Sequence, residues 1–253
     1  MKESNNVYIY DGTIEGLFTI VYKCMTEKVL PLNVIKDKIK LSLFENYITI
    51  DTDLNISNKI FNSIPKRMSD MTLYNVYNAF LSSKNDKEIN IVNYLINGYK
   101  YGKNLNKIRT LDSIVKVQKY SNMVRREAHK LKGFIRFEDV NGILYSKIAP
   151  EHDVLEILIP HFKNRLKNET WVIEDTKRNK AVFYDKNKYK VISTIDLDLN
   201  KLSKKDNDKT YKELWKTFIK SVMIKERKNL RCQMNFMPKR YWKYMTEMED
   251  INE

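Results

Sequence analysis

The sequence predicts an α+β fold, in which a mostly helical first half is followed by an antiparallel sheet flanked by helices. Three observations carry this prediction. Apolar residues recur at helical spacing up to Lys132, an Asn-Gly pair at residues 141–142 indicates a β-hairpin, and segments rich in β-branched and aromatic residues surround that pair. We expect a mainly helical region at residues 1–132 and an α+β region at residues 133–253, either separate or joined in one continuous domain.

The first region begins with a short apolar strand at residues 7–10 and a helix at residues 14–25, which Asp11 or Thr13 can cap. Residues 31–57 are ambiguous, because helical spacing at 33–43 is followed by β-branched alternation. Four further helices are predicted, at 57–65, 70–82, 88–101 and 110–132. The last is the clearest, since its apolar or small residues recur every three or four positions.

The second region begins with the hairpin and continues with a helix that Pro160 interrupts. The predicted strands are 134–138, 143–148, 170–174, 181–184 and 190–194. The predicted helices are 151–166, an amphipathic segment at 211–223, and 238–249, with a polar linker at 196–208.

Composition restricts the class of protein. The 253 residues are 42% hydrophobic, as in folded proteins, and they contain neither a long apolar run nor the apolar core of a signal peptide. We therefore expect a cytoplasmic protein without a membrane contact. The two cysteines are far apart in sequence, which argues against a disulfide framework or a thiolate zinc site. Because GxGxxG, P-loop, HExxH and GxSxG motifs are missing, we expect no cofactor and no metal.

The net charge of +14 is concentrated in two segments. Residues 107–136 contain nine basic and two acidic residues, and residues 209–245 contain eleven and two. An AT-rich genome can raise the number of lysines, but it does not favour arginine. Seven of the ten arginines lie in these two segments. Two basic segments on a nearly neutral body indicate contact with a polyanion.

Both segments interleave cations with aromatic rings, which is typical of nucleic-acid surfaces. On the helix, Arg126 and Lys130 form a row that can follow a phosphate backbone. The rings could equally be core residues beneath solvated charges. The candidate nucleic-acid-binding residues are Arg125, Arg126, Lys130, Arg136, Phe137, Arg227, Arg231, Lys239, Arg240 and Trp242, with Phe137 and Trp242 as candidate stacking groups.

Four residues are candidates for catalysis. His129 or His152 could act as an acid–base group, and Asp11 or Glu15 could supply a carboxylate. Each has a structural alternative, because histidines often lie in cores and a carboxylate near a helix start commonly caps that helix.

Six short segments together resemble a bacterial family described as DNA-repair or DNA-metabolism proteins: YDGTIEG (10–16), EAHKLKGFIRF (127–137), PEHD (150–153), PHF (160–162), WKTF (215–218) and MPKRYW (237–242). The resemblance implies a radical SAM protein as partner, since such a protein is typically encoded beside the family. Some members are fused to a uracil-DNA-glycosylase-like domain. We expect no glycosylase activity here, because this chain stops at Glu253 without that domain, and the resemblance transfers no catalytic residue.

Three functions follow from these observations. The first is a DNA-binding accessory protein that acts with the radical SAM partner in repair or modification. The second is a DNA-processing enzyme, a lyase, nuclease or glycosylase, that uses His129 or His152. The third is a protein–protein adaptor whose basic face meets an acidic partner.

Overall fold

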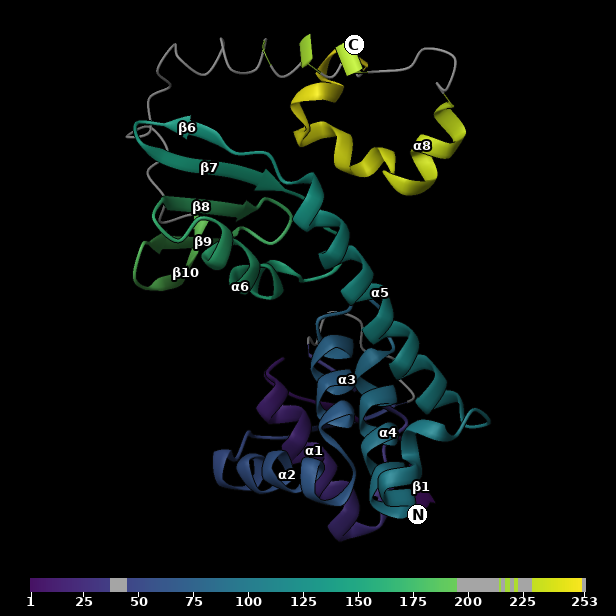
Figure 1. Cartoon of the computed structure of the whole chain (residues 1–253). Helices are drawn as coiled ribbons and strands as arrows, with labels where there is room; N and C mark the ends of the chain where they lie inside the picture. The colour runs from purple at the N-terminus through teal and green to yellow at the C-terminus, as the bar shows by residue number, and fades with distance from the viewer. Residues whose placement is uncertain (37–44, 195–213, 215–216, 219–220, 223–228, 252–253) are drawn as a thin grey trace. The chain divides into compact units, whose positions relative to one another are not determined.

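The computed structural model describes residues 1–36, 45–194, 214, 217–218, 221–222 and 229–251 (Figure 1). The chain forms two compact units, Met1–Arg125 and Arg126–Glu253. Helices prevail in the first half and a five-stranded sheet lies in the second, so the predicted α+β class is confirmed. None of the helices in the described ranges has both the length and the apolar character of a membrane span.

Helices dominate the first unit, and several begin at a side-chain cap that the sequence supplies. Thr13 accepts a hydrogen bond from the Gly16 amide, and Ser69 accepts one from the Thr72 amide. The helices are α1 (Ile14–Glu27), α2 (Leu54–Arg67), α3 (Asp70–Phe80), α4 (Lys87–Tyr101), the 3-10 helix η1 (Gly102–Lys107) and α5 (Asp112–Phe134), which continues into the second unit.

The first unit also contains a parallel sheet, of which the sequence indicated the strand at residues 7–10 and the β-branched alternation after residue 43. Its order is β4 (Asn33–Ile35), β2 (Asn6–Ile9), β5 (Asn46–Thr49), and β1 (Lys2–Glu3) pairs separately with β3 (Val29–Leu30). The helical interpretation of 33–43 is therefore wrong for residues 33–35, and residues 37–44 lie outside the described part. Strands of two or three residues, such as β1, β3 and β4, are too short to show an alternation.

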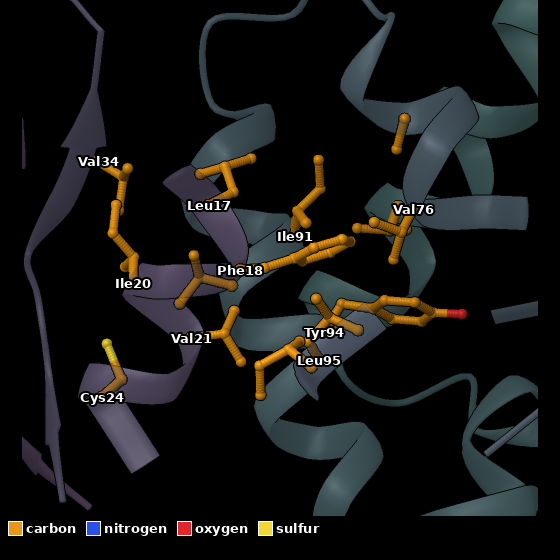
Figure 2. Packing of buried hydrophobic residues seen from close by; sticks show 14 of the residues in the cluster. Leu17, Phe18, Ile20, Val21, Cys24, Val34, Val76, Ile91, Tyr94 and Leu95 are labelled. Carbon is orange, nitrogen blue, oxygen red and sulfur yellow. The ribbon is translucent and has the colours of Figure 1, made fainter. Parts of the chain in front are cut away.

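The core of the first unit lies between α1 and α4. Leu17, Phe18 and Val21 of α1 face Ile91 and Leu95 of α4, and all five side chains are buried (Figure 2). The apolar spacing of both helices thus places one face of each in the same core.

The second unit is built on a sheet with the order β10-β9-β8-β7-β6. Its strands are β6 (Glu138–Val140), β7 (Ile143–Ile148), β8 (Thr170–Asp175), β9 (Lys180–Asp185) and β10 (Tyr189–Ser193). The predicted hairpin is confirmed, since Asn141 and Gly142 have φ values of 56° and 81° between the paired strands β6 and β7. The predicted sheet was antiparallel, but β7 and β8 are parallel, so the sheet is mixed. The helix between them, α6 (Leu155–Arg165), is the crossover that a parallel pair requires.

The C-terminal part differs more from prediction. The described helices there are α8 (Leu230–Phe236) and two 3-10 helices, η5 (Lys239–Tyr244) and η6 (Thr246–Ile251), in place of one helix at 238–249. The linker at 196–208 and most of the segment 211–223 lie outside the described residues. Gly133, expected to end a helix, instead lies inside α5.

Candidate functional site

A buried carboxylate at Glu127 organises the second unit. Glu127 lies on the inner side of α5, where it accepts hydrogen bonds from the main-chain amides of Glu151 (3.0 Å) and His152 (2.7 Å). The Tyr241 hydroxyl donates a third hydrogen bond at 2.7 Å. Burial and this bond to an anion raise the pKa of Tyr241, so the phenol remains a donor at neutral pH.

Arg240 completes this arrangement, which we call the carboxylate clamp (Glu127, Glu151, His152, Arg240 and Tyr241). Its guanidinium lies 2.8 Å from Glu151 Oε2 and 3.6 Å from Glu127 Oε1, and it donates to the Tyr241 hydroxyl at 2.9 Å. Burial lowers the pKa of Arg240, but the contacts with Tyr241, Glu127 and Glu151 outweigh this effect and raise it. The clamp therefore joins three of the sequence segments noted above: 127–137, 150–153 and 237–242.

One exposed side of α5 carries basic side chains. Arg126 and His129 are exposed, and Lys130 is partly exposed. Because these positions are three and four residues apart, the three side chains share one side of the helix, which we call the basic face (Arg126, His129 and Lys130). None of them has an ion pair with a carboxylate in the described part of the chain.

The remaining predicted cations divide into two groups. Arg231 and Lys239 are exposed, and the Lys239 ammonium lies 5.9 Å from the centre of the Trp242 ring. Arg136 instead forms an ion pair with Glu247 at 2.6 Å. Arg125 belongs to the first unit, where its guanidinium lies 5.2 Å from the centre of the Tyr74 ring. Arg227 lies outside the described residues.

The two predicted stacking groups pack inside the second unit. The Trp242 side chain is 3% exposed, and its indole N–H donates to the Met237 carbonyl at 2.8 Å. Phe137 lies edge-on to Phe162, with 5.4 Å between the ring centres. Trp242 therefore belongs to the core of the unit, whereas Phe137 is half-buried.

The three histidines have different surroundings. His152 is only 2% exposed, and its amide is bound by Glu127, whereas His129 is exposed on the basic face. Burial and the nearby Lys132 and Arg165 lower the pKa of His161. Of the two histidines considered for catalysis, His129 alone is open to solvent.

Asp11 and Glu15 belong to the first unit, and Asp11 has a structural use. Its carboxylate accepts from the Thr13 amide (2.9 Å), the Thr13 hydroxyl (2.7 Å) and the Thr52 hydroxyl (2.7 Å). Partial burial raises the pKa of Asp11, but these bonds outweigh it and hold the pKa below its usual range. A Cβ atom at Gly16 would lie 2.6 Å from Asp11 Oδ1, which explains the second glycine in YDGTIEG.

The described residues contain no group of three or more His, Cys, Asp and Glu side chains that could hold a metal ion. Glu127, the buried carboxylate of the clamp, was not among the sequence candidates. Its signal was its position, because it is three residues after buried Val124 and four before buried Leu131, where a charge is out of pattern.

One family model, a domain of unknown function (DUF4130), matches residues 85–247. No curated protein and no solved structure shows significant similarity to the chain.

Proposed function

The chain belongs to the DUF4130 family of domains of unknown function, and from this premise we propose that it is a DNA-binding accessory protein whose second unit contacts DNA through the basic face. The basic face carries the proposal. Arg126, His129 and Lys130 share the outer side of one helix, and carboxylates of the described fold do not neutralise them. Cations without a carboxylate partner can bind phosphate oxygens, and contacts with phosphates dominate the affinity of proteins for DNA.

The ion pairs of the second unit separate the candidate arginines into two groups. Arg240 and Arg136 are held by carboxylates, so we assign them to the fold rather than to phosphate contact. Arg126, Lys130, Arg231 and Lys239 remain as the proposed phosphate contacts, and Arg227 stays a candidate from sequence. Phosphate contacts of this kind position a protein on DNA without reading its sequence.

The test measures binding of the full chain to fluorescein-labelled single- and double-stranded DNA by anisotropy across a salt series. The double variant Arg126→Gln/Lys130→Gln should bind more weakly than the unchanged protein. The slope of log K against log salt should fall by about 2, since two phosphate contacts are lost.

A matched control removes two positive charges from another part of the same unit. Lys188→Gln/Lys190→Gln removes two exposed lysines near β10, and DNA affinity and salt slope should remain unchanged. Equal losses in both double variants would mean that only net charge matters. An unchanged slope in the Arg126/Lys130 variant would refute the basic face as a DNA contact.

As an accessory protein the chain also needs a partner enzyme. The radical SAM protein implied by the family resemblance is our proposed partner, and we propose that the two act together in bacterial DNA repair or modification in the cytoplasm. Co-expression of the two proteins, followed by size-exclusion chromatography, should give one co-eluting peak. Separate elution at micromolar concentrations would argue against a stable complex.

A further inference from the structure

The first unit has a large hollow in its surface at the helices α1, α2 and α3. Its volume is about 880 Å³, within the range of ligand and peptide sites. The residues that matter for its chemistry are Glu15, Phe18, Phe61, Asp70, Met71 and Tyr74. We call this hollow the apolar groove, and all of its lining belongs to Met1–Arg125.

The walls of the groove expose apolar side chains that a folded unit normally covers. Phe61 is 46% exposed, Met71 53% and Tyr74 45%. Phe61 lies on buried Phe18, with 6.4 Å between the ring centres, so an exposed aromatic layer continues directly into the core. Aromatic residues and Met are enriched where proteins bind other proteins.

The spacing of these residues fits a helical ligand. Met71, Tyr74 and Tyr77 recur every three residues on α3, so this helix presents an apolar row to the groove, and α2 contributes Phe61. A groove with an apolar row between neighbouring helices is the usual receptor for the apolar face of an amphipathic helix.

The charge at the groove determines which kind of amphipathic helix can bind there. Glu15 and Asp70 lie in the first turns of α1 and α3 and line the groove, and neither has an ion pair among the described residues. Carboxylates at this position repel polyanions and favour cations. Arg125 is not part of the lining, but its guanidinium lies 5.2 Å from the Tyr74 ring centre, so this ring is able to make a cation–π contact.

We infer that the apolar groove is the docking site for a partner protein's amphipathic helix, with apolar residues on one face and Lys or Arg at its borders. The inference does not depend on the proposed DNA contact, since the groove residues and the basic face belong to different units. The two can therefore fail separately.

The first experiment uses two synthetic helical peptides of roughly 18 residues, or five turns. One has leucine on one face and lysine on the other, and the second replaces every lysine by glutamate. Calorimetric titration of the full chain should show binding of the lysine peptide, with the glutamate peptide about tenfold weaker or worse. Absence of lysine-peptide binding, or equal affinity for both, overturns the inference.

Variants then locate the binding. Phe61→Ser should weaken the binding of the lysine peptide about tenfold. Leu54 is an exposed apolar residue on the same helix but outside the lining, so Leu54→Ser should leave this binding unchanged. Circular dichroism checks that both variants remain folded. Equal weakening by the two substitutions would mean non-specific adhesion and overturn the inference.

A charge exchange supplies the sharpest result. Glu15→Lys/Asp70→Lys should reverse the preference, so that the glutamate peptide binds better, while Glu3→Lys, an exposed carboxylate elsewhere in the unit, should leave it unchanged. Retention of the original preference would refute the role of the two carboxylates. A loss of DNA affinity with Phe61→Ser, without a change in peptide binding, would assign the groove to nucleic acid instead.

Discussion

The two units bury polar groups of different kinds. In the first unit the buried polar side chains are mostly neutral, for example Asn75, Asn78, Asn90 and Ser121, with Glu88 as the buried carboxylate. The second unit buries three carboxylates within its described residues: Glu127, Glu174 and Asp175.

Neutral amides and hydroxyls connect the first unit. Asn106 accepts from the Tyr94 hydroxyl at 2.6 Å and donates to Thr72 Oγ1 at 3.0 Å, and Ser121 donates to Asn75 Oδ1 at 3.1 Å. Each group in such a network can be donor or acceptor, so the loss of one member leaves neutral atoms that water or a neighbour can satisfy.

Ionised groups connect the second unit. Tyr145 donates to Glu174, Arg178 pairs with Asp175 at 2.9 Å, and the clamp surrounds Glu127. A buried charge that loses its partner is costly, because desolvation is no longer compensated. From this difference we expect that a single substitution of a buried polar residue destabilises the second unit more than the first. It does not follow that the buried ionised groups contribute more to net stability.

The largest effect should come from breaking the clamp. Glu127→Ala leaves two buried amides and the Tyr241 hydroxyl without their acceptor, and Arg240 without one of its two carboxylates. We expect a loss of about 3–5 kcal/mol in the free energy of unfolding, because each buried donor that is left without an acceptor costs about 1–3 kcal/mol. Urea denaturation measures it, with exposed Glu169→Ala as control. A loss as small as that of the control would refute the clamp.

The neutral network gives the matching test in the first unit. Asn106→Ala should destabilise by about 1–3 kcal/mol, because Tyr94 and Thr72 lose uncharged partners. The same denaturation experiment compares it with Glu127→Ala. If Asn106→Ala is the more damaging of the two, the contrast between the units is wrong.

A cap at the surface should have a smaller effect. Thr13→Ala removes the acceptor of the Gly16 amide at the start of α1 and the hydroxyl bound to Asp11, at an expected cost of about 1 kcal/mol. Thr13→Ser keeps the oxygen and should be nearly neutral. Equal thermal stabilities of the two variants would show that the cap contributes nothing.

The smallest effect should be a dependence on pH in the first unit. Partial burial raises the pKa of Asp86, but bonds from Tyr120 and Lys116 outweigh it and lower the pKa. A lowered carboxyl pKa stabilises the fold above about pH 4, and this contribution disappears as the pH falls through the lowered value. Tyr120→Phe should lose less stability on acidification than the unchanged protein. An identical acid response would contradict the assignment.

The sequence predicted those elements whose determinants are local. The Asn141-Gly142 hairpin and the cap at the start of α1 were confirmed, because each depends on residues a few positions apart. The parallel pairs β2·β4 and β7·β8 were missed, since a parallel partner lies beyond a crossover helix and leaves no signal next to the strand.

The candidate site was predicted only in part, for the same physical reason. Composition located the basic segments, but it could not separate Arg240, which binds Glu151, from Arg126, which has no carboxylate partner among the described residues. That distinction depends on which carboxylate approaches in three dimensions. The sequence of α5 did contain one indication, because the charged Glu127 lies among buried apolar positions. A charge at such a position indicates a buried polar contact.

The clamp also sets the order in which the second unit can be completed. Glu127 and Tyr241 are 114 residues apart. At a synthesis rate of roughly 5–20 residues per second, about 6–23 s pass between the synthesis of Glu127 and that of the hydroxyl that it binds. Until then α5 exposes a carboxylate and the apolar residues beside it, a state that chaperones and proteases can recognise. A ribosome that pauses late in the message would prolong this interval and lower the yield of folded protein without any change in the sequence.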